Sequence, residues 1–104
     1  MAVLKSINPF DPSRIINYPQ VSDMNLAVQL GRSQASFIKY RQSSFEERAQ
    51  LMKQVALILK ERSRDLAEVI TREMGKPIHE AAAEVKKCAW VCEYYAENAV
   101  IFLK

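Results

Sequence analysis

The most constraining feature of this sequence is its last quarter, residues 77–104, in which no residue interrupts a helical pattern. Beyond Ala89 apolar residues lie on every side of the predicted helix, and a helix that is apolar all round must be enclosed by other elements. We therefore expect cover on all sides, with a second helix approaching closely where the residues are small. That side is lined by Ile78, Ala81, Ala82, Val85, Ala89, Cys92, Ala96, Ala99, Val100 and Leu103.

The predicted helix is longer than the domain that 104 residues can build. At 1.5 Å per residue, residues 77–104 would span about 42 Å, whereas a compact domain of this size has a diameter of roughly 33 Å. The last turns would extend past that body, and leaving Val100–Leu103 in water forgoes about 1.5–3 kcal/mol for each side chain. We expect that the partner surface is not encoded here, so the chain is either the first part of a larger protein or half of an obligate complex.

The first 21 residues contain three of the four prolines and show no helical period. Asn8-Pro9 and Asp11-Pro12 are typical of turns, and the flanking β-branched residues favour extended backbone. These residues predict a β-hairpin. It needs another element to pack against, because two strands alone are only marginally stable in water.

Ser22 is predicted to cap a helix that ends near Tyr40 and is buried over more than half of its circumference. Its apolar residues form two strips on its surface. One strip contains Met24, Ala27, Val28, Gly31, Ala35 and Ile38, and the other contains Leu26, Leu30 and Phe37.

Two further helices follow. Ser44 and Glu47 have the spacing of a capping box, in which each side chain accepts from the other residue's backbone N–H. Ser63 is predicted to cap a third helix, which ends at Gly75, a residue suited to the left-handed stop of a helix. Pro77 then opens the last helix. The predicted fold class is mostly α, with an N-terminal hairpin and four helices.

The composition excludes several classes of function. Two glycines leave almost nothing for a phosphate-binding glycine-rich loop, and the net charge of +3 comes from basic and acidic residues that alternate. Nucleic-acid binding is therefore not expected. No apolar run approaches the roughly 20 residues that cross a bilayer, and neither a signal core nor a transit segment is recognisable. We expect a cytoplasmic protein with no membrane partner.

The cysteines, Cys88 and Cys92, are four residues apart on the predicted helix. Helical neighbours at this spacing hold their Cβ atoms about 5–6 Å apart, too far for a disulfide. We expect two free, buried and inert thiols. Metal ligation is the alternative, but no second cysteine pair exists and His79 is not at a zinc-finger spacing.

Other chemical candidates have simpler structural explanations. Gly75-Lys76 lacks the remaining residues of a phosphate loop. Glu80 and Glu84 share a helix face, where carboxylates near a helix N-terminus are more common than an acid–base pair. His79 has no nucleophile at a recognisable spacing. Trp90, Tyr94 and Tyr95 could stack on a ligand, and burial against another element explains them equally well.

Several of these strings, in this order, resemble the N-terminal segment of the NAD(P)-dependent aldehyde dehydrogenase superfamily. The strongest is Glu73–Pro77, and Asn8-Pro9 with the following strand resembles the family's opening hairpin. Cys88–Cys92 and Tyr94–Ala99 are most similar to the succinate-semialdehyde dehydrogenase branch. The sequence departs from the family pattern at Asp11–Ser13, where a glycine is usual, and at Tyr40, where tryptophan is usual.

The resemblance implies that residues 1–104 are the N-terminal portion of an α/β enzyme, with 1–21 as a hairpin arm and 22–104 as helices of the cofactor-binding domain. It implies oxidation of an aldehyde, succinate semialdehyde, to a carboxylic acid with NAD or NADP, and a homo-oligomer at full length. The family's catalytic cysteine, its glutamate and its nucleotide contacts lie downstream. We therefore expect no catalytic, cofactor-binding or metal-binding residue in this segment, which alone should be inactive.

A second hypothesis remains open. The chain could be a free-standing helical interaction module that docks its last helix onto a partner. A stable, monodisperse chain would favour this hypothesis, whereas aggregation or molten behaviour would favour the enzyme segment.

Overall fold

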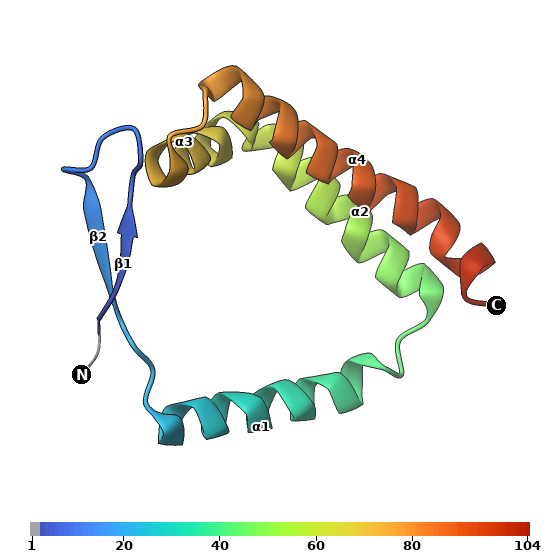
Figure 1. The fold of residues 1–104 in the computed structure, drawn as a ribbon. Coiled ribbons are helices and arrows are strands. Elements are labelled where there is room, and N and C mark those ends of the chain that lie inside the picture. The colour runs from blue at the N-terminus through green and yellow to red at the C-terminus, as the bar shows by residue number, and fades with distance from the viewer. Residues whose placement is uncertain (1–2) are drawn as a thin grey trace.

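The computed structural model describes residues 3–104, so residues 1 and 2 of the predicted arm lie outside the described residues. The hairpin and the four helices are confirmed. In chain order the elements are β1 (Val3–Ile7), β2 (Ile15–Pro19), α1 (Asp23–Tyr40), α2 (Phe45–Glu61), α3 (Ser63–Met74) and α4 (Ile78–Phe102), as Figure 1 shows.

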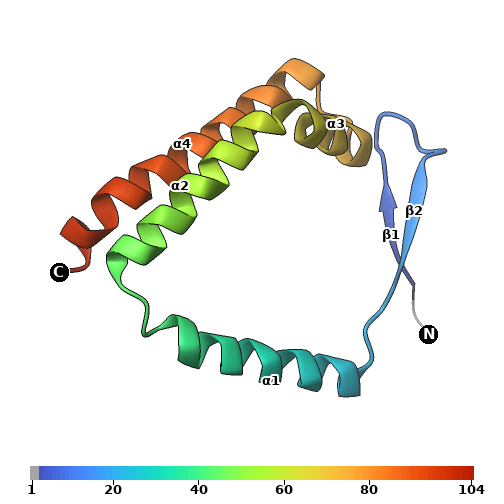
Figure 2. The ribbon, with the colours of Figure 1, turned by 180° about the vertical axis from the view of Figure 1, so that it is seen from behind.

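Helices α2 and α4 lie side by side and run in opposite directions, and α3 packs near the end where α2 finishes and α4 begins (Figures 1 and 2). The buried apolar residues are small, which lets the helix backbones approach closely: Ala56, Ala67, Ala81, Val85 and Ala89. The predicted stripe on the last helix is thus confirmed in its first half. No large side chain of the described residues is fully buried.

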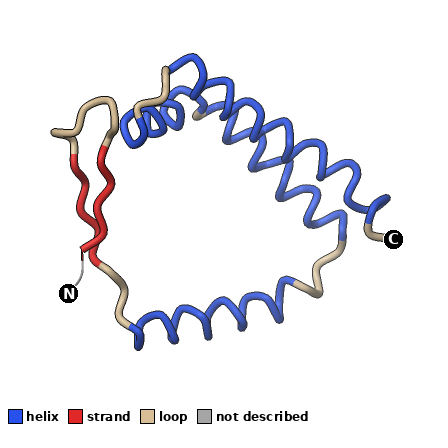
Figure 3. Tube along the Cα trace, in the orientation of Figure 1, coloured by secondary structure: helices blue, strands red, loops and turns tan. Residues whose placement is uncertain are grey.

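Strands β1 and β2 pair antiparallel, with Val3 opposite Pro19 and Ile7 opposite Ile15. The hairpin contacts α3 through β1, so the predicted need for a packing partner is met by that helix. The hairpin, α1, the α2–α4 pair and α3 together form an open frame (Figure 3).

Helix α1 has no buried residue, and its one contact with another element among residues 3–104 is at its C-terminal end, where Arg48 of α2 reaches Tyr40. The prediction that it is buried was therefore wrong for residues 3–104, because nothing in that part of the chain covers its apolar strips. The radius of gyration is 17.9 Å, well above the value of about 13 Å for a compact domain of this length. As expected for the far half of α4, residues 3–104 do not supply its cover, with Trp90 63% and Ile101 64% exposed.

Most helix ends follow the sequence signals. The Ser22 hydroxyl accepts from the Asn25 backbone N–H at 3.2 Å. In the capping box the Glu47 carboxylate accepts from the Ser44 N–H at 2.7 Å, and the Ser44 hydroxyl accepts from the Glu47 N–H at 3.1 Å. Gly75 ends α3 in the left-handed conformation with φ of 73°.

The Ser63 cap is a correction. Ser63 is the first residue of α3, Arg62 occupies the cap position, and no side chain caps this helix. Arg62 ends α2 and begins α3 without an intervening loop, and its carbonyl already accepts from the Leu66 N–H at 3.0 Å. Because Ser63 is already inside the helix, its hydroxyl is not in the cap position.

Candidate docking surfaces

The polar residues around the start of α4 form an ion pair. Lys76 Nζ donates to Glu84 Oε2 at 2.6 Å, and this hydrogen bond raises the pKa of the Lys76 ammonium. Gly75 and Lys76 are thus a helix stop and an ion-pair partner. Glu80 and His79 lie exposed on the first turn of α4. This geometry offers neither a phosphate loop nor a paired carboxylate site.

Both thiols are free, as predicted, but they are not buried. Cys88 is exposed and Cys92 is half-buried. The prediction of buried thiols was wrong because α4 has no neighbour on that side within residues 3–104. In the same range no three His, Cys, Asp or Glu side chains are grouped so that they could hold a metal ion.

Three aromatic residues of α4 contact one another. Tyr94 and Tyr95 meet edge to face, with ring centroids 5.3 Å apart, and the ring centroids of Tyr94 and Phe102 are 6.2 Å apart. Trp90 and Tyr95 remain more than half exposed. No element of residues 3–104 buries these aromatic side chains, so their burial against another element stays a prediction.

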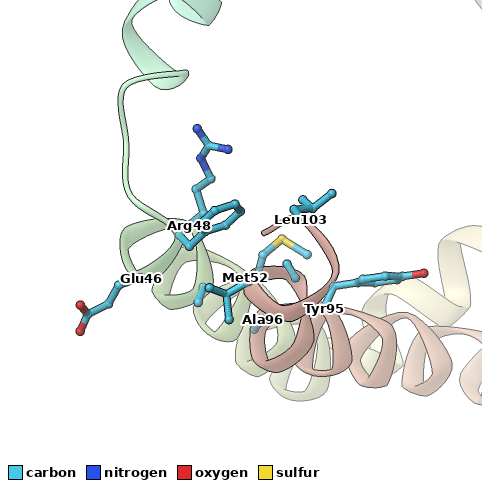
Figure 4. Close-up of a pocket in the computed structure, with 10 residues that line it drawn as sticks. Glu46, Arg48, Met52, Tyr95, Ala96 and Leu103 are labelled. Atoms are coloured by element: carbon cyan, nitrogen blue, oxygen red, sulfur yellow. The ribbon is translucent and has the colours of Figure 1, made fainter.

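A groove of about 300 Å³ lies between the first turns of α2 and the last turns of α4. Figure 4 shows Met52 of α2 and Leu103 near the end of α4 on its apolar lining, whereas Glu46 points away from it. The ion pair between Lys60 and Glu93 also joins these two helices, farther along their length. Besides Glu46, Arg48 and Tyr95 its lining is apolar, so the groove can receive an apolar segment.

Asn8 fastens the hairpin to α3. It is only 6% exposed, and its side-chain amide donates to the carbonyl oxygens of Arg72 at 2.7 Å and Thr71 at 3.4 Å. Its Oδ1 accepts from the Phe10 N–H at 2.9 Å. Asn8 thereby supplies a donor to the Arg72 carbonyl at the end of a helix, where intrahelical partners are missing, and a second donor to the Thr71 carbonyl, which also accepts from the Gly75 N–H. The sequence indicated a turn at Asn8, but nothing local to it indicated this contact.

Arg48 fixes the link between α1 and α2. Its guanidinium donates to the Ser43 hydroxyl at 2.9 Å and to the carbonyl of Arg41 at 3.0 Å. It also lies over the rings of Tyr40 and Phe45, at 5.3 and 5.9 Å from their centroids. These contacts hold the link where α1 ends, and sequence analysis did not single out Arg48.

The area of uncovered surface decides what kind of site this is. The accessible surface is 8581 Å², roughly 2,600 Å² more than a compact protein of 11.9 kDa exposes. A standard protein–protein interface buries about 800 Å² on each partner. The excess surface is therefore about three times the area that one partner contributes to an ordinary interface. None of the described helices is both long and apolar enough to span a membrane.

Known proteins match nearly the whole chain. The sequence profile of the aldehyde dehydrogenase family matches residues 2–101. The chain is 38% identical over 101 residues to "Succinate semialdehyde dehydrogenase [NAD(P)+] Sad" of Escherichia coli, covering 95% of this chain and 21% of that protein. It is 35% identical over 100 residues to "Probable succinate-semialdehyde dehydrogenase [NADP(+)]" of Synechocystis, covering 96% and 22%. The chain thus spans about a fifth of the length of the curated relatives it matches.

Proposed function

The chain belongs to the aldehyde dehydrogenase family, and we propose that it is the N-terminal portion of an NAD(P)-dependent enzyme that oxidises succinate semialdehyde to the carboxylic acid. Residues 1–21 form a hairpin arm and residues 22–104 contribute helices to the cofactor-binding domain. The substrate is taken from the names of the relatives, which are succinate-semialdehyde dehydrogenases. The complete enzyme is a cytoplasmic homo-oligomer.

The observation that carries this proposal is the uncovered surface of the frame. Leu30 of α1 is 62% exposed and Leu103 at the end of α4 is 68% exposed. Two such side chains at opposite parts of the frame need cover from a large body, because burying each one stabilises a protein by about 1.5–3 kcal/mol. A chain about five times longer, as in the relatives, supplies that body.

We assign no nicotinamide nucleotide site to residues 1–104. Gly75-Lys76 is the one glycine–lysine pair, and its lysine is held by Glu84 at the start of α4. Cys88 and Cys92 line a hollow together with Glu80, Glu84 and Lys87, but among residues 3–104 no hydrogen bond joins either thiol to a base, as an activated nucleophile requires. We therefore place the catalytic and cofactor-binding residues outside these 104 residues, and we assign this segment a structural role.

A chimera tests the proposal. The N-terminal segment of the E. coli relative that matches this chain is replaced by residues 1–104, and the product is called the Sad chimera. We expect it to reduce NAD+ or NADP+ in the presence of succinate semialdehyde, measured by the absorbance of the reduced nicotinamide. The isolated chain should show no turnover under the same conditions.

The same measurements separate the two hypotheses. Turnover by the isolated chain would contradict the structural role of this segment. A Sad chimera without activity, together with an isolated chain that is monodisperse and unfolds cooperatively, would favour the interaction module that docks through α4. Aggregation of the isolated chain would agree with the enzyme segment.

A further inference from the structure

Helix α1 carries two apolar strips that together span an arc of roughly 240° at about 100° per residue, and the polar residues Asp23, Ser33 and Gln34 also lie within this arc. The small-residue strip contains Met24, Ala27, Val28, Gly31, Ala35 and Ile38. The bulky strip contains Leu26, Leu30, Phe37 and Tyr40. The remaining polar strip contains Asn25, Gln29, Arg32, Ser36 and Lys39. A single neighbouring element cannot cover both apolar strips, because their centres lie roughly 145° apart around the helix axis.

Both apolar strips are bare within residues 3–104. Leu26, Leu30 and Phe37 are 51%, 62% and 53% exposed. A Cβ placed at Gly31 would have no atom within 4 Å. Glycine in a helix interior is unfavourable relative to alanine, and a closely approaching backbone is a physical reason to have no side chain there. No part of the described chain makes use of that space.

We propose that α1 is an enclosed helix in the complete protein, covered by polypeptide that lies outside these 104 residues. One element packs closely over Gly31 on the small-residue strip, and a second packs on the bulky strip. The polar strip stays in contact with water. This inference rests on the proposed function, because the relatives, of which the chain spans about a fifth, supply the additional polypeptide.

The size of the bare surface favours that occupant over a second copy of the chain. Roughly 2,600 Å² of excess surface is several times the area of about 800 Å² that each partner contributes to a standard dimer. The ends of α1 are also held in place. Ser22 caps its first turn, and Arg48 binds the carbonyl of Arg41 at its C-terminal end. The C-terminal end of α1 is therefore fixed to α2, and both apolar strips are exposed.

Substitutions on the three strips test the inference in the Sad chimera and in the isolated chain. Gly31→Leu should lower the unfolding midpoint of the chimera by at least about 3 °C, because a large side chain enters a packed contact. Ser36→Leu is the matched control on the polar strip and should shift it by less than about 1 °C. Leu30→Ser should also lower it, and Gln29→Ser should not.

The isolated chain should respond differently to the same substitution. There Gly31→Leu should not lower the helical content, because nothing lies near that position. An assembled, active chimera in which Gly31→Leu and Ser36→Leu behave alike would overturn the inference and leave the proposed function intact. A chimera that does not assemble would overturn both. Concentration-dependent protection of α1 amides in the isolated chain would identify a second copy as the occupant and overturn the inference alone.

Discussion

The side-chain amide nitrogen of Asn8 lies 2.7 Å from the carbonyl oxygen of Arg72, and this hydrogen bond joins residues 64 positions apart. It ties the turn of the hairpin to the last turn of α3, so two segments far apart in the sequence lie next to each other. Helix α1 contacts another element of the described residues only through Arg48 of α2 at its C-terminal end, so its placement in the frame depends on the Arg48 link and on the hairpin that Asn8 ties to α3. Contacts thus hold the frame between the hairpin and α3 and between α1 and α2, whereas α1 itself is uncovered.

Asn8→Ala should release the hairpin from α3. The substitution leaves the Arg72 and Thr71 carbonyls without the Asn8 donors, and it removes the acceptor of the Phe10 N–H. Leaving buried polar groups unsatisfied costs about 1–3 kcal/mol. Urea unfolding should show this loss, and hydrogen exchange should show faster exchange in the hairpin. Asn17→Ala, an exposed position in β2, is the control and should change stability by less than about 0.5 kcal/mol.

The two glycines should respond to alanine with opposite signs. Gly75 has φ of 73°, and a Cβ there would lie 2.8 Å from Phe10 Cβ and 3.0 Å from Asn8 Oδ1. Gly75→Ala should therefore cost about 1–3 kcal/mol. Gly31 is helical with open space around it, so Gly31→Ala should stabilise the isolated chain by up to about 1 kcal/mol. Equal effects in thermal unfolding would contradict this explanation.

The corrected start of α3 predicts a difference between two serines. Ser44→Ala removes the acceptor of the Glu47 N–H and should destabilise the chain by about 1 kcal/mol. Ser63→Ala should cost nothing measurable, because no side chain caps α3. Circular dichroism during urea unfolding measures both. A loss at Ser63 equal to that at Ser44 would show that Ser63 acts as the cap after all.

These residues also show which parts of the fold are readable from sequence. The Ser44 capping box and the Gly75 stop act within a few residues, so their signals predicted the start of α2 and the end of α3 correctly. Ser63 was misread because cap preference alone does not reveal that Arg62 already ends one helix and starts the next. Local signals therefore predict helix ends well only where a loop separates the helices.

The candidate surfaces were harder to predict, because burial depends on elements distant in the chain. Apolar periodicity identified which side of α4 packs, and Ala81 and Ala89 are buried there. The same periodicity predicted buried thiols and a buried α1, whereas Cys88 and α1 are exposed. The periodicity of apolar residues predicts which helix faces need to be covered. It does not predict whether residues 3–104 contain the element that covers them. The partner of Asn8 was unreadable for a related reason, since it lies 64 positions away.

The ion pair between Lys76 and Glu84 predicts a contribution to stability that is lost at alkaline pH. The hydrogen bond from Lys76 to the Glu84 carboxylate raises the pKa of the Lys76 ammonium in the folded chain. A raised folded pKa means that the folded state holds this proton more tightly than the unfolded state. The contribution is complete below the ordinary lysine pKa of about 10.4 and disappears as the pH rises through the higher folded value.

Lys76→Gln should therefore unfold at lower urea than the wild type at pH 8, and the difference should shrink toward pH 11.5. Added salt should shrink it as well, because the pair is solvent-accessible and exposed charges are screened. Lys87→Gln is the control, since Lys87 forms no ion pair among residues 3–104. A difference between wild type and Lys76→Gln that stays constant across this range would mean that Lys76 stabilises the start of α4 by packing of its methylene chain, with no contribution from its charge.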